Sequence, residues 1–207
     1  MKKTIIPSTP FGPVAIVWSL FNDLPKIVRV LLSTPEVSAK TRVSRLYPDS
    51  EASSCAEINA VARDIGAFLE GEDVRFSLDV VDLSSCSLFQ QSVLRAEHRI
   101  PRGKVSTYHL IAFHLGKGNG ARAVGNALAN NPFPIVVPCH RAIRSDRSLG
   151  GFQAGLDMKR ALLRNEGIDF DSSGRVLIGR FHYEREGEAF RKDPLAVHPS
   201  RREELEE

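Results

Sequence analysis

The chain has few cysteines and no long apolar run. Its three cysteines, Cys55, Cys86 and Cys139, form no zinc-type spacing, and no histidine is placed to complete one. We therefore expect no metal and no cofactor, and reduced thiols in a cytoplasmic protein. No apolar run approaches the roughly 20 residues that span a membrane, and no signal-like stretch follows Lys2 and Lys3. These absences argue against a membrane or secreted protein.

Charge is spread unevenly along the chain, although the formal net charge is only +3. Residues 1–89 carry nine Lys/Arg against eleven Asp/Glu, residues 90–170 twelve against five, and residues 171–207 seven against nine. A basic middle segment suits a polyanion such as DNA. A solvated arginine-rich surface would give the same count, so charge alone leaves both interpretations open.

The amino-terminal pattern predicts a β-hairpin followed by a loop. Apolar, β-branched residues fill 13–21 and 26–32, and the turn residues Asn22 and Asp23 separate them. Residues 34–54 are rich in Ser, Thr and Pro, which is typical of a loop.

One helix and one further strand complete the expected amino-terminal unit. Apolar residues recur at helical spacing over 55–70, with Ser54 and Glu57 in the positions of a capping box. Alternating apolar and polar residues predict a strand over 76–80. The first 80 or so residues therefore form a small α+β unit.

From residue 87 onward the pattern becomes helical. It predicts helices over 87–100, 107–115, 121–130 and 156–166, with a glycine-rich turn at 116–120. Two short helices around such a turn suggest a helix-turn-helix. Most helix pairs of this kind are only packing units, so this signal alone does not establish DNA binding.

Cys139 follows a short apolar run and directly precedes His140 and Arg141. A free thiol has a pKa of about 8.5, so a strong nucleophile needs a base to take its proton and a cation to stabilise the thiolate. Glu166 could orient the imidazole if its helix packs back against this segment. A cysteine beside a histidine is more often structural, so the spacing leaves both interpretations open.

An ordered series of motifs resembles the O6-alkylguanine-DNA alkyltransferase family. The stretch NPFPIVVPCHRAI at 131–143 is similar to the active-site signature of that family. The other motifs are Phe89-Gln90, IPRGKVSTY at 100–108, ARAVG at 121–125, GGFQAGL at 150–156 and KRALLRNE at 159–166. The resemblance covers about residues 88–168, and the amino-terminal unit fits it more loosely.

The resemblance implies a single irreversible reaction at Cys139. This residue would accept the alkyl group of O6-alkylguanine in DNA, and O4-alkylthymine is a further candidate substrate. His140 would act as its base through a water, and Glu166 would polarise His140. Tyr108 would donate its hydroxyl to the guanine, and Asn131 would be a hinge between the helix-turn-helix and the active-site segment.

The resemblance also assigns residues to DNA and to the substrate pocket. Arg122 would enter the base stack in place of the flipped nucleotide, and small residues of its helix would fit the minor groove: Ala123, Gly125, Ala127 and Ala129. Further DNA contacts are expected from Gln90, His109 and Ser145, although an ordinary surface histidine is the better interpretation of His109. The expected pocket residues are Pro134, Ala142, Phe152 and Gln153. Phe152 stands where some members have tyrosine.

We therefore expect an α+β fold with two domains and an extension. Residues 1–86 would form the amino-terminal α+β domain, and 87–172 a mainly helical DNA-binding and alkyl-transfer domain with a winged-helix-like helix-turn-helix. Residues 173–207 would be a polar extension. The expected partner is double-stranded DNA, bound by a monomer.

Two alternatives remain. One is a non-catalytic relative that binds alkylated DNA and recruits other repair factors, but such relatives lack the thiol that Cys139 provides. The other is a cysteine hydrolase or thiol peroxidase using Cys139 and His140, which would have no need of a helix-turn-helix.

Overall fold

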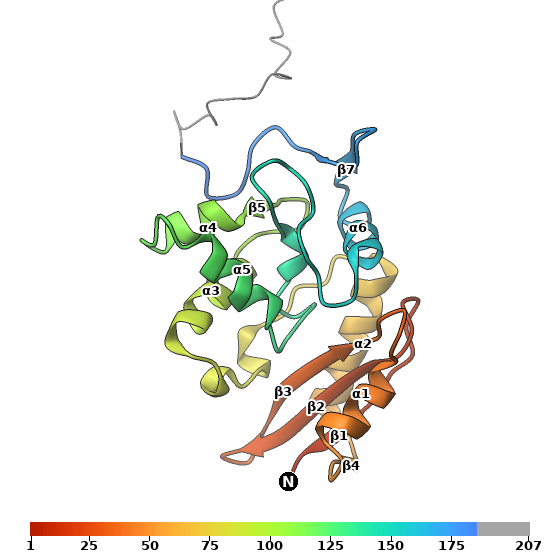
Figure 1. Ribbon diagram of the computed structural model, residues 1–207. Coiled ribbons are helices and arrows are strands. Elements are labelled where there is room, and N and C mark those ends of the chain that lie inside the picture. Colours follow the sequence, from red (N-terminus) through yellow and green to blue (C-terminus); the bar gives the residue numbers. More distant parts are fainter. Residues whose placement is uncertain (186–207) are drawn as a thin grey trace, which may run out of the picture.

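The computed structural model describes residues 1–185 (Figure 1). A four-stranded sheet with order β3-β2-β1-β4 forms the amino-terminal part. Its strands are β1 (Lys3–Ile5), β2 (Val14–Phe21), β3 (Leu24–Leu32) and β4 (Glu51–Ala52). The predicted hairpin is confirmed as β2 and β3, which pair antiparallel. Asn22 and Asp23, the two residues of the turn between these strands, both have positive φ.

The φ angles of this turn are 49° at Asn22 and 60° at Asp23. Both angles lie in the left-handed region, which a two-residue hairpin turn needs.

The two faces of the sheet pack against different partners. Ala15, Val17 and Leu31 lie against α1 (Ala39–Leu46), whereas the alternate residues of β2 and β3 face α2 (Ala56–Glu70) and the second half of the chain. Because both faces are covered there, the first five residues of β2 are buried, whereas Leu20 and Phe21 near the turn are exposed.

The prediction that 34–54 is only a loop was wrong, because α1 and β4 lie within it. Ala39 and Val43 are the buried residues of α1, so its helical repeat is too short to stand out in the sequence. The helix begins after Ser38, whose hydroxyl accepts a hydrogen bond from the Thr41 amide.

The predicted helix over 55–70 is confirmed as α2, but its capping box is not. The helix begins after Cys55, without a side-chain cap, so Ser54 is not the N-cap residue. Gly71 ends it with φ 104°. The strand predicted over 76–80 was also wrong: residues Leu78–Val80 form the short 3-10 helix η1, held by Ser77 at its start.

The predicted helices of the second half are confirmed. They are α3 (Leu88–His98), α4 (Tyr108–His114), α5 (Ala121–Ala129) and α6 (Leu156–Asn165). Short elements connect them: η2 (Leu83–Ser85), η3 (Cys139–Arg141), and the parallel pair β5 (Ser106–Thr107) and β6 (Ala142–Ile143). No helix among residues 1–185 is long and apolar enough to cross a membrane.

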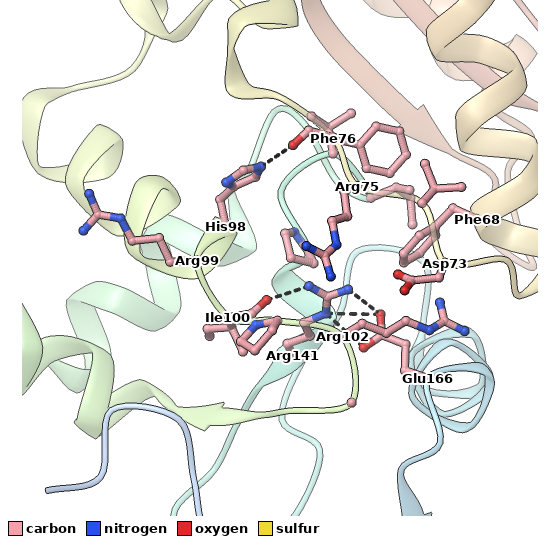
Figure 2. A pocket seen from close by; sticks show the side chains of 16 residues that line it. Phe68, Asp73, Arg75, Phe76, His98, Arg99, Ile100, Arg102, Arg141 and Glu166 are labelled. Carbon is pink, nitrogen blue, oxygen red and sulfur yellow. Dashed lines mark hydrogen bonds and ion pairs between the residues drawn. The ribbon is translucent and has the colours of Figure 1, made fainter.

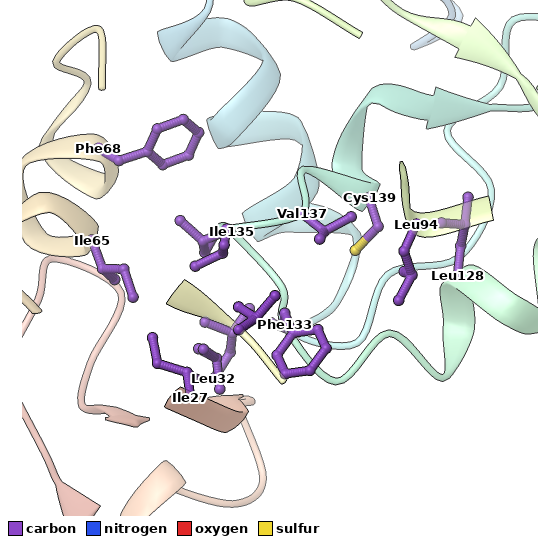
Figure 3. Close-up of a cluster of buried hydrophobic side chains, with 14 of the residues drawn as sticks. Ile27, Leu32, Ile65, Phe68, Leu94, Leu128, Phe133, Ile135, Val137 and Cys139 are labelled. Carbon is purple, nitrogen blue, oxygen red and sulfur yellow. The ribbon is translucent and has the colours of Figure 1, made fainter. Parts of the chain in front are cut away.

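One large apolar core joins the two halves. Figure 3 shows Ile27 of β3, Ile65 of α2 and Leu128 of α5 in the same cluster as Cys139. The amide of Val30 also donates to the Pro132 carbonyl, which ties β3 to the segment before Cys139. The sheet therefore supports the segment that carries the cysteine.

The described part of the predicted extension packs against the rest of the chain. After the hairpin of β7 (Asp169–Phe170) and β8 (Val176–Leu177), Phe181 is buried, and the Tyr183 hydroxyl donates to the Ala96 carbonyl. Residues 173–185 are thus part of the folded structure, and residues 186–207 lie outside the described residues.

Arg102 joins the amino-terminal unit to the last helix. Its guanidinium donates to the carbonyls of Gly71 and Glu72 at the end of α2, and to that of Asn165 at the end of α6. A cation at the carbonyl ends of two helices also complements both helix dipoles.

We expect Arg102→Ala to lower the free energy of unfolding by about 1–2 kcal/mol, because several charge-assisted hydrogen bonds are lost at a partly exposed site. Urea unfolding followed by circular dichroism measures this change. Lys104→Ala removes an exposed cation two residues away and serves as the control, with an expected change within about 0.5 kcal/mol. Equal losses in the two variants would show that Arg102 does not hold the junction.

Candidate active site

Cys139 lies at the start of η3 and borders a cavity of about 660 Å³. Its side chain is buried, with 5% of the residue exposed. The opposite walls come from α5 and from the loop at 150–153. The lining of this cavity includes Tyr108, Arg122, Gly125, Arg144, Phe152 and Gln153.

Asn131 fixes the turn that leads into Cys139. Its Nδ2 donates to the Val137 carbonyl over 3.0 Å, and its Oδ1 accepts from the Phe133 amide over 2.9 Å. Within this turn Ile135 has φ 75°, a conformation that a β-branched residue rarely adopts. The two hydrogen bonds therefore help to hold a strained backbone directly before the cysteine.

His140, Arg141 and Glu166 form a buried network behind Cys139. His140 Nε2 lies 2.7 Å from Glu166 Oε1. Arg141 donates from Nε to Oε2 of the same carboxylate over 2.9 Å and from Nη2 to Oε1 over 2.8 Å. Its Nη1 donates to the Ile100 carbonyl over 2.6 Å, and Figure 2 shows Arg141 between these partners. One carboxylate thus fixes both residues that follow the cysteine.

The protonation states in this network follow from burial and pairing. Burial by itself would raise the pKa of Glu166, but hydrogen bonds and charges from His140 and Arg141 lower it to about 2. Burial lowers the pKa of His140, against the opposing effect of Glu166. The imidazole is therefore neutral at pH 7. Because an ionised carboxylate can only accept, Nε2 carries the proton and Nδ1 keeps a free lone pair.

The free nitrogen of His140 can serve as a base. Nδ1 is buried and has no hydrogen-bond partner among residues 1–185. The Cys139 thiol needs such a base, because burial raises its pKa to about 11 despite a hydrogen bond from Asn131. The resting site consequently holds a neutral thiol beside a neutral imidazole.

Tyr108 provides a hydrogen-bond donor on the cavity wall. Burial, with smaller effects of Glu97 and Cys139, raises the pKa of its hydroxyl to about 12, so the group stays protonated. The hydroxyl lies so close to Gly150 that a Cβ there would be 2.8 Å away. Gly150 also has φ 67°, so both space and backbone conformation favour glycine at this position.

Comparisons with known proteins agree with this site. Residues 88–168 match the family model for the DNA-binding domain of 6-O-methylguanine DNA methyltransferase. The methylated-DNA–protein-cysteine methyltransferase of Methanosarcina acetivorans is 39% identical over 120 residues, which cover 58% of this chain and 76% of that protein. The chain belongs to the methylated-DNA–protein-cysteine methyltransferase family.

Two further members of this methyltransferase family show how far the likeness extends. The protein of Methanothermobacter thermautotrophicus is 41% identical over 114 residues, which cover 55% of this chain and 64% of that protein, less than two thirds of its length. The crystal structure of Mycobacterium tuberculosis OGT in complex with DNA matches with 31% identity and a TM-score of 0.63. That match covers 80% of this chain and 91% of the other, so it includes the amino-terminal unit.

The structure brings part of the predicted methyltransferase site together around the cavity. Cys139, Tyr108, Arg122, Gly125, Phe152 and Gln153 all line it. Gln153 is held by a hydrogen bond from its Nε2 to the Asn131 carbonyl over 2.7 Å. Pro134 and Ala142, which were expected to line the pocket, are instead buried and are not among the described residues that line it. Pro134 belongs to the buried turn at 133–137, and Ala142 to the strand β6.

The predicted DNA-contacting residues lie in different settings. Arg122, Ala123, His109 and Ser145 are exposed. Gln90 donates from its amide to the carbonyls of Ala127 and Asn130, so it binds the end of α5. Ala127, which was expected on the DNA-facing side of α5, is buried in the core. Contacts of the exposed residues with DNA stay predictions.

Four charged residues of the site were not identified from the sequence. Arg141 was taken only as a cation near the thiol, and Arg144, Lys159 and Glu97 were given no role. The burial of Glu97 could have been predicted from the sequence, because Glu97 follows Val93 by four residues and so lies on the apolar face of its helix. Among residues 1–185, no three His, Cys, Asp or Glu side chains converge as a metal site.

We expect Glu166→Gln to lower the free energy of unfolding by about 3–5 kcal/mol at pH 7, because the Arg141 charge would stay buried without a carboxylate. Urea unfolding measures this loss. Glu57→Gln, at an exposed position of α2, is the control. Adding Arg141→Met to the first variant should recover most of the loss, and no recovery would contradict the proposed pairing.

The same substitution should change the acid dependence of stability. The folded pKa of Glu166, about 2, lies below its ordinary value of 4.5, so its stabilisation is present above pH 4.5 and is lost as pH falls toward 2. Midpoints of urea unfolding between pH 5 and pH 2 should therefore fall less steeply in the Glu166→Gln variant than in the wild type.

Proposed function

We propose that this protein repairs DNA by transferring the alkyl group of O6-alkylguanine to Cys139 Sγ. The observation that carries this proposal is the cavity at α5, which places a buried thiol, the Tyr108 hydroxyl and Arg122 around one space. His140, the residue next to Cys139 in the chain, would be the base, and its hydrogen bond with Glu166 supports this role. The activity in the names of the related proteins agrees with this chemistry.

The proposed reaction balances without a cofactor. The thiol proton passes to His140 Nδ1 through a water while Sγ attacks the alkyl carbon. The new bond is S–C, and the bond that breaks joins that carbon to guanine O6. Tyr108 donates a hydrogen bond to the guanine as negative charge develops on the guanine, and the proton held by His140 finally passes to the dealkylated guanine, which stays in the DNA. The thioether is not hydrolysed under cellular conditions, so each chain reacts once.

The proposed substrate is double-stranded DNA, bound by a monomer. A base must leave the stack to reach a buried thiol, and the exposed Arg122 at the first turn of α5 could take its place. Exposed Ala123 and half-buried Gly125 add little bulk, which suits the minor groove. The crystal structure of Mycobacterium tuberculosis OGT contains DNA, which supports the choice of partner. Activity on O4-alkylthymine and a cytoplasmic location stay predictions.

Transfer is tested with duplex DNA that carries radiolabelled O6-methylguanine. We expect label on the wild-type chain at no more than one per molecule, and none on Cys139→Ala. Mass spectrometry of the labelled peptide identifies the acceptor. Binding to the lesion without labelling would reject transfer in favour of a non-catalytic binder that recruits other repair factors. Repeated turnover would instead indicate a hydrolase.

Arg122→Ala tests base flipping separately from chemistry. We expect transfer from duplex DNA to slow by about tenfold or more, while transfer from free O6-benzylguanine stays within about twofold, because a free base needs no flipping. Single-turnover rates on both substrates measure this difference. Exposed Lys117→Ala, in the turn between α4 and α5, controls for a general loss of positive charge. Equal slowing on the two substrates would refute the role of Arg122.

A further inference from the structure

The segment that follows β8 packs behind the active site, although the proposed reaction uses none of its side chains. Figure 1 shows the blue segment after β7 crossing from the side of α6 to the side of α4. Its residues 176–183 contact two parts of the chain that border the Cys139 cavity. One is the stretch that leads into Tyr108, and the other is the loop that leads into Gly150.

His182 holds the residues that precede Tyr108. Its amide donates to the Val105 carbonyl over 2.8 Å, and its carbonyl accepts from the Ser106 hydroxyl over 2.7 Å. Ser106 belongs to β5, which pairs with β6 directly after η3. Because Tyr108 follows β5 as the first residue of α4, these bonds fix the backbone from which its side chain extends.

Tyr183 holds the other end of α4. Its ring stacks on His114, the last residue of that helix, with 3.9 Å between the ring centroids and 21° between the planes. Its hydroxyl donates to the Ala96 carbonyl of α3 over 2.8 Å. The φ of Tyr183 is 69°, which a bulky residue rarely adopts. Such a backbone persists only where its surroundings hold it, so these two contacts offset a local strain.

The same segment also holds the loop on the other side of the Tyr108 hydroxyl. The Val176 amide donates to the Arg147 carbonyl over 3.0 Å. Phe181 is buried in a second apolar cluster, which includes Leu110 of α4 and Leu149 of the loop. The segment therefore packs against both the helix that begins with Tyr108 and the loop that leads into Gly150.

We propose that residues 176–183 are part of the active-site framework, and that Tyr183 is a positioning residue that fixes the Tyr108 hydroxyl. The proposal rests on the proposed function in taking Tyr108 as the donor to guanine. Gly150 has no side chain where this hydroxyl approaches it, so movement of α4 or of the loop would shift the donor. A misplacement of about 1 Å can slow a reaction by up to about 100-fold.

Tyr183→Gly removes the ring without straining the backbone, because glycine adopts positive φ readily. We expect transfer from free O6-benzylguanine and from duplex DNA to slow equally, by about three- to tenfold, because Tyr108 acts on the guanine itself. Single-turnover rates on both substrates measure this change. Slowing confined to duplex DNA would overturn the proposal and would indicate that the segment acts on DNA binding.

A double-mutant cycle separates positioning from a general loss of stability. Tyr108→Phe removes the hydroxyl, so adding Tyr183→Gly to that variant should slow transfer by less than about 1.5-fold. Tyr183→Phe keeps the ring on His114 and loses only the bond to Ala96, so we expect it to retain most of the wild-type rate. Effects of Tyr108→Phe and Tyr183→Gly that multiply in the double variant would contradict positioning through Tyr108.

Hydrogen exchange tests the packing without any alkyl transfer. In Tyr183→Gly, amides of residues 105–112 should exchange about three- to tenfold faster than in the wild type, while those of α2 stay unchanged. Leu177→Ala removes an exposed side chain of β8 and should alter neither exchange nor transfer. Unchanged exchange of residues 105–112 in Tyr183→Gly would overturn the proposal. A wild type that transfers no alkyl group would instead reject the proposed function, whatever the exchange shows.

Discussion

The buried hydrogen bonds and ion pairs of Glu166 with His140 and Arg141, the two residues that follow Cys139, hold the site together. Glu166 closes α6, whereas His140 and Arg141 belong to η3, so one carboxylate joins the last helix to the nucleophile segment. Arg141 extends the contact to the Ile100 carbonyl after α3. An isolated buried charge would be costly, and here each charge meets an opposite one and several hydrogen bonds. The imidazole is left neutral and oriented as a result.

The same low-polarity surroundings keep the reacting groups uncharged at rest. Burial keeps Cys139 and Tyr108 protonated near neutral pH, since it raises both pKa values. Charge would develop only when a substrate fills the cavity and the proton can move toward His140. Fixed donors and acceptors then act without rearrangement, which is the main source of electrostatic catalysis in buried sites.

The sequence allowed α2 to α6, the hairpin and the Cys139–His140–Glu166 set to be predicted, because these depend on local repeats or on motifs that resemble those of a known family. It did not allow α1 to be predicted, since Ala39 and Val43 are its buried residues. The partner of Arg141 could not be predicted either, because the Ile100 carbonyl and Glu166 come from distant elements. Glu97 and Lys159 lie far apart in the chain, so folding alone shows that they share one environment.

The junction at Arg102 has a consequence for how the family can diverge. Each of its three acceptors is a main-chain carbonyl, which every residue supplies. Side chains along α2 and α6 can therefore be exchanged during evolution without loss of this contact. The guanidinium has no such substitute, since a lysine ammonium is a point charge without the planar fork. This polar contact, which adds to the apolar core shared by the two halves, thus depends on one side chain and places little constraint on the sequence of the amino-terminal unit.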